Sequence, residues 1–386
     1  MSDSNRNQEG SNQGVPESLW KALFEWSVTA REQNDSASPT TSTPEQQQQL
    51  SASDREWLEE ALAAGVVDLS KQLVDIKAQL ETTLPETASE ADVAADTDTK
   101  VRLLEELLDL VESIDQAKDL STIGGLGTLL NVIDANEGRP GLQWRAAEVI
   151  GTCAQNNPDV QSSFYDAGVM PKIWGLLSSA DGTCRLKALL AVSCMLRGSA
   201  AVHGWFSEND GTGRMVEMLG DVDDFEDIGD GSDVGDRRSR IRRKCLQILT
   251  YVAEQPSVED RRRLLELSGV LERALAGFLS DMDPVVDRDV EKAALDLGKR
   301  LAIQGLLAEN PTDLVQALQL YLARMDVVMH DKKEDWEAVE ENIVVGKALL
   351  EVLTSYVPPA ATLAGAPASP SAMQVVAATQ TDSNDS

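Results

Sequence analysis

Apolar residues recur along most of this chain at the three- and four-residue spacing of an α-helix. Residues 142–155 show the pattern most clearly. Spacings of three and four residues put side chains on one side of a helix. In this stretch one side is polar, with Arg145, Glu148, Thr152 and Gln155, and the other is small or apolar, with Ala147, Ile150, Gly151 and Ala154. The pattern predicts an amphipathic helix that must bury one face against a neighbour.

The same kind of unit recurs downstream with a regular period. A glycine precedes a short apolar helix at four junctions, at Gly125, Gly168, Gly211 and Gly269. The first two intervals are equal, and the third is longer, which an acidic insertion at 221–236 explains. The equal intervals fall within the length of about 40–47 residues that is typical of armadillo repeats. The sequence therefore predicts an all-α fold, an armadillo-repeat solenoid that winds as a right-handed superhelix.

The remaining segments are arranged around this repeat domain, which we expect to span residues 100–357. A helical segment is predicted at 53–80, and a Thr-, Ala- and acid-rich linker at 81–99 joins it to the repeats. Residues 1–52 are mostly polar and predict a flexible N-terminal arm. Residues 358–386 follow two prolines, lose periodicity and predict a disordered tail.

Charge and composition narrow the range of partners. The chain has 65 acidic and 34 basic residues, a formal net charge of −31. Such a field repels nucleic acid and anionic lipid, so we expect neither as a partner. The four cysteines all fall in predicted helices and form no Cys-x-x-Cys pair. That usage is typical of reduced, buried thiols. We expect a soluble monomer in the cytosol, and the sequence leaves a nuclear location open as well.

Candidate catalytic and metal-binding patterns are weak. His203 and His330 are the only histidines, and neither has a Cys or His at zinc-ligand spacing. The glycines at 124–127 and 211–213 follow no predicted strand and lack the Gly-Lys-Ser/Thr ending of a phosphate loop. The acidic stretch 221–236 does not match the EF-hand ligand spacing. We therefore expect no catalytic residue, no metal and no cofactor.

A basic residue recurs near the start of each long repeat helix. Aligning these helices along the chain places Arg145 over Lys187 and both over Arg243. A solvated helix face explains such charges without any function. A basic stripe along an inner groove, complementary to an acidic protein surface, explains why the charges keep their register. Both interpretations remain open on periodicity alone.

Four short motifs carry a family resemblance. Residues 144–157, Trp-Arg-Ala-Ala-Glu-Val-Ile-Gly-Thr-Cys-Ala-Gln-Asn-Asn, resemble the signature of the armadillo-type nucleotide-exchange factors of heat-shock protein 70 (Hsp70). Residues 113–120 look like the turn before that family's first full repeat. Residues 23–28 resemble its Leu-x-x-Trp-Ser start, and residues 54–61 resemble the following helix of plant-type members.

The resemblance implies a co-chaperone. In this family the concave armadillo face clasps lobe II of the Hsp70 ATPase domain and promotes ADP release. Matching positions here give the candidate contacts Ala117, Arg145, Gln155, Asn156, Lys187 and Arg243. Ala117 would stay small to admit the partner's backbone, and Arg243 would meet a carboxylate.

The resemblance also implies a role for an apolar module at 19–28. In the family, the N-terminal arm enters the Hsp70 substrate-binding domain as a pseudo-substrate and releases clients. Exposed apolar clusters usually mark an interaction site. The corresponding residues here are Leu19, Trp20, Leu23, Phe24 and Trp26.

A different armadillo role is the main alternative. Import receptors carry Trp-x-x-x-Asn pairs on successive long helices. This chain has that spacing once, from Trp205 to Asn209, at a repeat junction. An armadillo adaptor that binds acidic peptide segments of another partner stays open.

Overall fold

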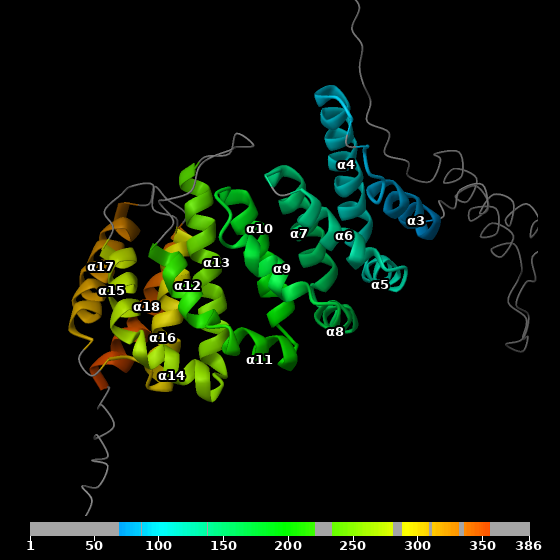
Figure 1. Cartoon of the computed structure of the whole chain (residues 1–386). Coiled ribbons are helices and arrows are strands. Elements are labelled where there is room, and N and C mark those ends of the chain that lie inside the picture. The colour runs from blue at the N-terminus through cyan, green and yellow to red at the C-terminus, as the bar shows by residue number, and fades with distance from the viewer. Residues whose placement is uncertain are drawn as a thin grey trace, which may run out of the picture. The chain divides into compact units, whose positions relative to one another are not determined.

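The computed structural model describes residues 69–85, 87–136, 138–220, 234–280, 288–308, 311–331 and 336–355 (Figure 1). The apolar module at 19–28, the rest of the predicted arm, the first part of the 53–80 segment, most of the acidic insertion and the predicted tail lie outside these residues. The chain divides into two compact units, Met1–Thr82 and Thr83–Ser386. No helix of the described residues has an apolar stretch that could cross a membrane.

The first unit contributes one described helix, α3 (Leu69–Leu80). Its buried residues Leu73, Ile76 and Leu80 follow the three- and four-residue spacing of one helix face. Lys77 forms an ion pair with Glu81 one turn later, at 2.8 Å. The helical prediction for this part of the chain is therefore correct.

The second unit begins with α4 (Glu90–Val111), so the predicted linker 81–99 is wrong from residue 90 onward. The helix starts at a capping box. The Ser89 backbone N–H donates to Asp92 Oδ2 at 3.0 Å, and the Asp92 backbone N–H donates to Ser89 Oγ at 3.3 Å. These bonds satisfy donors that a helix start leaves free. Local capping thus makes a helix from a polar stretch that lacks apolar periodicity.

Four units of three helices follow α4 in the described part of the chain, and the third helix is the longest of each unit. They are α5 (Ile114–Thr122), α6 (Gly125–Ala135) and α7 (Pro140–Ala154); α8 (Pro158–Asp166), α9 (Val169–Leu176) and α10 (Gly182–Leu196); α11 (Ala200–Glu208), α12 (Gly211–Gly220) and α13 (Val234–Glu254); and α14 (Val258–Glu266), α15 (Ser268–Ser280) and α16 (Arg288–Gln304). The helices α17 (Thr312–Asp331) and α18 (Trp336–Ser355) close the domain.

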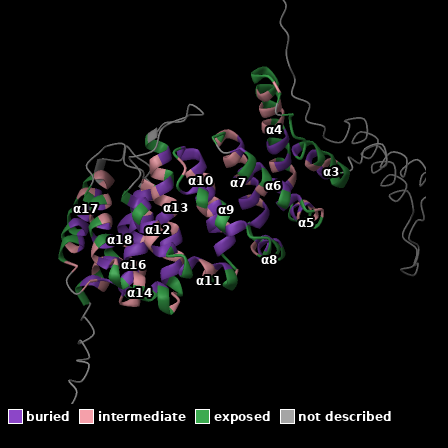
Figure 2. Ribbon diagram, in the orientation of Figure 1, coloured by how far each residue is buried: buried purple, intermediate pink, exposed green. Residues whose placement is uncertain are grey.

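The long helices pack against one another in chain order. α4 contacts α7, α7 contacts α10, α10 contacts α13, α13 contacts α16, and α16 contacts α18. Figure 1 shows this row through the second unit, and Figure 2 shows that the buried residues lie on the faces between helices. Repeats that each contact mainly their neighbours make a solenoid. The predicted all-α armadillo fold is confirmed.

Glycine permits a close approach between the backbones of α7 and α10. A Cβ at Gly151 of α7 would lie 3.2 Å from Ala191 Cα of α10, so the two backbones nearly touch. Small residues at the contact are what allow such approach between helices. The predicted small face of residues 142–155 is thus the packing face.

Enlarging Gly151 is expected to separate these helices. Gly151→Val should lower the free energy of unfolding by about 1–3 kcal/mol, because the backbone of α10 must move. The matched control is Gly277→Ala in α15, where an added Cβ meets nothing within 4 Å. It should raise stability by up to about 1 kcal/mol through helix propensity. Urea unfolding followed by circular dichroism checks both; equal stability of the two variants would contradict the packing argument.

Candidate protein-binding groove

Buried positions show how the long helices correspond. The apolar pattern that begins at Ala146 in α7 recurs from Ala188 in α10 and from Cys245 in α13. In each helix the pattern is buried at the first, second, fourth, fifth, eighth and ninth positions. Ala146, Ala188 and Cys245 are therefore equivalent residues.

This correspondence corrects the sequence alignment of α13 by one position. The cation equivalent to Arg145 and Lys187 is Lys244, and Arg243 is its neighbour. Several basic residues are adjacent at this point of α13, so the charges alone do not fix the register. The apolar face fixes it, because each helix can bury only one side.

A groove of about 680 Å³ lies along the polar faces of α10, α13 and α16, and we call it the long-helix groove. It contains five cations and three carboxylates, although the whole chain carries a net charge of −31. A positive concave site in an acidic protein favours a negatively charged partner locally. The residues that line it are Leu186, Arg197, Arg240, Arg243, Lys244, Gln247, Thr250, Tyr251, Glu254, Asp289, Lys292, Ala293 and Asp296.

Ion pairs join successive long helices on their polar faces. Between α4 and α7, Arg145 Nη2 lies 2.8 Å from Glu105 Oε1. Between α7 and α10, Lys187 Nζ lies 2.5 Å from Glu148 Oε1. In both pairs the acid belongs to the earlier helix and the cation to the later one.

Both directions occur further along the row. Arg243 of α13 pairs with Asp289 of α16, and Lys292 of α16 lies 2.6 Å from Glu341 of α18, so in these pairs the cation belongs to the earlier helix. Between α13 and α16 there is also a pair of the first kind, with Arg300 Nη2 at 3.1 Å from Glu254 Oε1. Partly exposed ion pairs of this kind contribute about 0–1 kcal/mol each. They can therefore be exchanged for contacts with a partner at little cost.

The predicted contact residues on α7 lie at the surface. Arg145 is half-buried, and its guanidinium carbon lies 4.0 Å from the centroid of the Trp144 ring. Gln155 and Asn156 are exposed where α7 ends, and Asn156 has a left-handed φ of 54°. Gln155 is equivalent to Arg197, which lines the groove one repeat later.

Ala117 is not a surface residue. It is 1% exposed and lies on the buried face of α5, which packs against α4, α6, α7 and α8. The expectation that its side chain meets a partner's backbone is therefore wrong. Its small size serves the packing of the first repeat instead.

Two groove residues, Lys244 and Tyr251, were not among the predicted contacts. The pKa of Lys244 is lowered from its ordinary value, first by burial and then by the positive charge of Arg197. The Arg197 guanidinium carbon lies 5.9 Å from the centroid of the Tyr251 ring. Aligning the long helices by their buried positions would have identified both residues. In that alignment Lys244 is equivalent to Lys187, and Tyr251 is equivalent to Cys194 of α10.

The cysteines are free and unsuited to thiolate chemistry. Cys153, Cys184 and Cys245 are buried, and burial raises the pKa of each thiol to about 12. Cys194 is half-buried, and burial raises its pKa as well. Within the described residues, no group of three His, Cys, Asp or Glu side chains could hold a metal ion.

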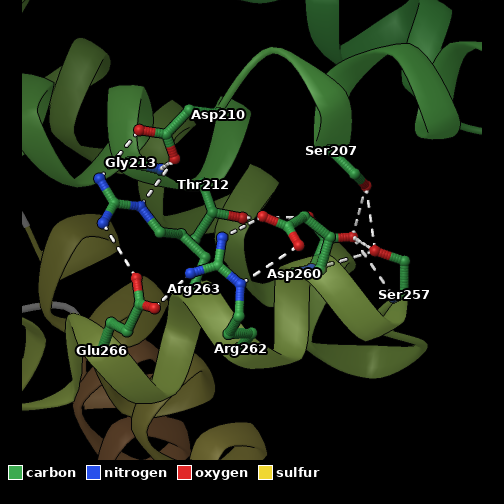
Figure 3. A network of polar contacts seen from close by, with 10 residues as sticks. Ser207, Asp210, Thr212, Gly213, Ser257, Asp260, Arg262, Arg263 and Glu266 are labelled. Carbon is green, nitrogen blue, oxygen red and sulfur yellow. Dashed lines mark hydrogen bonds and ion pairs between the residues drawn. The ribbon is translucent and has the colours of Figure 1, made fainter.

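A buried carboxylate, Asp260 of α14, holds the third and fourth repeats together (Figure 3). It is 1% exposed and accepts hydrogen bonds from Ser207 Oγ at 2.7 Å, Ser257 Oγ at 2.6 Å and Thr212 Oγ1 at 3.2 Å. Beside it, Arg263 donates two bonds to Asp210, at 2.8 and 2.9 Å. The first of these networks joins α11, α12 and the start of α14.

The Asp260 network also brings serines and a histidine together without making a nucleophile. His203 Nε2 lies 3.2 Å from Asp260 Oδ2 but forms no hydrogen bond. Both serine hydroxyls contact the carboxylate and lie 3.1 Å apart, and neither bonds to the imidazole. A serine nucleophile needs that bond to lose its proton. The cluster is a structural clamp.

Comparisons with known proteins agree on one group. The family described as "Nucleotide exchange factor Fes1" matches residues 20–120, and the family described as "SIL1/FES1/HPBP1 C-terminal domain" matches residues 116–223. Hsp70-binding protein 1 of Homo sapiens is 33% identical over 204 residues, 52% of this chain and 54% of that protein. The Hsp70 nucleotide exchange factor FES1 of Mycosarcoma maydis is 30% identical over 138 residues, 35% of each chain.

The chain spans about half the length of the human relative and about a third of the fungal one. Among solved structures, an engineered protein matches with a TM-score of 0.50 and 17% identity, over 75% of this chain and 100% of that one. At this identity the likeness concerns the fold alone.

Removing the charge of Asp260 is expected to loosen the clamp. Asp260→Asn should lower the free energy of unfolding by about 1–3 kcal/mol, because an amide accepts fewer of the buried hydroxyl donors. The control Asp159→Asn changes an exposed carboxylate on α8 and should shift stability by less than about 0.5 kcal/mol. Chemical denaturation measures both. A loss no larger than that of the control would contradict the clamp.

Proposed function

Because residues 20–223 match the two SIL1/FES1/HPBP1 and Fes1 family models, we propose that this protein is a nucleotide-exchange factor of an Hsp70 chaperone. It binds lobe II of the ATPase domain through the long-helix groove and promotes ADP release. The observation that carries the proposal is the groove itself, a local excess of cations on a strongly acidic protein.

Exchange of this kind needs binding preference and no covalent chemistry. If the protein prefers the ATPase domain without nucleotide, linkage requires that it weaken nucleotide binding by the same factor. A widened cleft in the clasped state then lets ADP leave faster. The protein is a co-chaperone and makes or breaks no bond.

The charges of the groove favour docking of an acidic partner at this part of the surface. The chain as a whole is acidic and repels an acidic partner, and the groove attracts it, so docking is favoured at the groove. Arg145, Gln155, Asn156, Lys187 and Arg243 supply donors to the partner's surface. Arg145, Lys187 and Arg243 would exchange weak internal ion pairs for contacts with lobe II.

The N-terminal arm supplies a second contact. Its apolar residues enter the Hsp70 substrate-binding domain as a pseudo-substrate, so that bound client is released while nucleotide exchanges. Large apolar side chains in a polar segment support this role. They are Leu19, Trp20, Leu23, Phe24 and Trp26. We expect the protein to act in the cytosol as a monomer.

An adaptor for acidic peptide segments is the second candidate, since the same cations suit an extended acidic chain. The two functions differ in what binds. An exchange factor binds the folded ATPase domain of Hsp70, and an adaptor does not.

Reversing one groove charge is expected to remove most of the stimulated ADP release. Arg243→Glu puts a carboxylate where an acidic partner must approach and should lower stimulated ADP release at least tenfold. Lys172→Glu reverses an exposed charge on α9, outside the groove, and should leave release unchanged. Stopped-flow release of a fluorescent ADP analogue from Hsp70 measures both. Full activity of a folded Arg243→Glu protein would refute the groove as the binding site for Hsp70.

Removing the arm is expected to separate the two parts of the function. Deletion of residues 1–30 should preserve ADP release, because the groove lies in the second unit. It should slow the release of a labelled client peptide from Hsp70 severalfold. Replacing all the apolar residues of the module by serine is the matched control for chain length. Equal client release with and without the arm would count against the pseudo-substrate role.

A further inference from the structure

The ion pairs between long helices follow a repeat rule at the start of the row. The acids Glu105 of α4 and Glu148 of α7 occupy equivalent positions relative to the buried face of each helix. Each pairs with the cation of the next helix, Arg145 or Lys187. One acid and one cation thus meet at each of the first two interfaces.

The third interface breaks the rule. The residue of α10 equivalent to Glu148 is Leu190, which cannot form an ion pair. The cation of α13 that should receive the acid is Lys244. The interface between α10 and α13 therefore has a cation in the repeat position and no acid opposite it.

Neighbouring pairs do not fill this gap. On the C-terminal side, Arg243 pairs with Asp289 and Glu254 pairs with Arg300, both on the following helix. Arg197, at the end of α10, adds a further positive charge beside Lys244. Within the described residues, no carboxylate forms an ion pair with Lys244 or Arg197.

The uncompensated cations carry a cost in the free protein. Lys244 is half-buried, and burial together with Arg197 lowers its pKa. A carboxylate brought to this point would remove the repulsion and would gain charge-assisted hydrogen bonds. Residues that destabilise the free fold in this way are characteristic of binding sites.

We propose that Lys244 and Arg197 together anchor a carboxylate side chain of the partner protein, which completes the ion pair that Leu190 leaves open. This inference rests on the proposed function, because the partner is the acidic surface of the Hsp70 ATPase domain. Both cations line the long-helix groove, and Lys244 is already partly withdrawn from water. A few desolvated anchors of this kind contribute most of an interface's affinity.

Truncation of the lysine tests the anchor. Lys244→Met should weaken binding to the nucleotide-free Hsp70 ATPase domain about 10- to 100-fold in isothermal titration calorimetry. Its unfolding midpoint should stay equal or rise, because an uncompensated charge has been removed from the free protein. The control Lys172→Met removes an exposed lysine of α9 and should bind like the wild type.

Restoring the missing acid tests the same point from the other side. Leu190→Glu places a carboxylate opposite Lys244, as Glu148 lies opposite Lys187. It should weaken binding about tenfold by occupying the anchor internally. Leu190→Gln introduces a side chain of the same shape as glutamate but without its charge. This variant should bind within about threefold of the wild type.

The outcomes separate this inference from the function on which it rests. If the wild-type protein does not bind the ATPase domain, the proposed function fails. If it binds, and Lys244→Met binds equally well, only the anchor is refuted. Equal binding by Leu190→Glu and Leu190→Gln refutes it as well. A lower unfolding midpoint with unchanged affinity would make Lys244 a structural residue.

Discussion

The structure depends on the close packing of successive long helices through their small, apolar faces. At Gly151 the backbone of α7 lies directly against Ala191 of α10, and this contact leaves little freedom for either helix to rotate. Because each helix can bury only one side, this packing determines which side chains reach the opposite, polar face. The register of the buried positions therefore decides the chemistry of the groove, although the groove's charged side chains are themselves not buried.

Charge is distributed on two scales. Over the whole chain, acidic residues outnumber basic ones almost two to one, which disfavours contact with nucleic acid and with anionic membranes. Within the long-helix groove the balance is reversed. In the proposed function, this local pattern selects a partner against an opposing background. Proteins that act by holding one state of another protein need this kind of discrimination more than they need high affinity.

The sequence predicted the repeat architecture well because periodic burial leaves a direct mark on the order of residues. Residues 142–155 show that mark, and the structure agrees with both faces. The prediction from sequence failed where the structure depends on something other than apolar periodicity. The capping box at Ser89 makes a helix without apolar periodicity, and the alignment of α13 turned on one residue in a basic run. The burial of Ala117 depends on four neighbouring helices, which no local pattern reveals.

The order of the ion pairs between the first long helices has a consequence for how such a domain can evolve. Its repeats are not interchangeable parts. Duplicating the second unit would place Leu190 opposite Lys187, so the new junction would lack an acid. Deleting that unit would place Glu148 opposite Lys244 and would supply the acid that is missing from the present interface. Recombination of these units is therefore constrained by electrostatics as well as by packing.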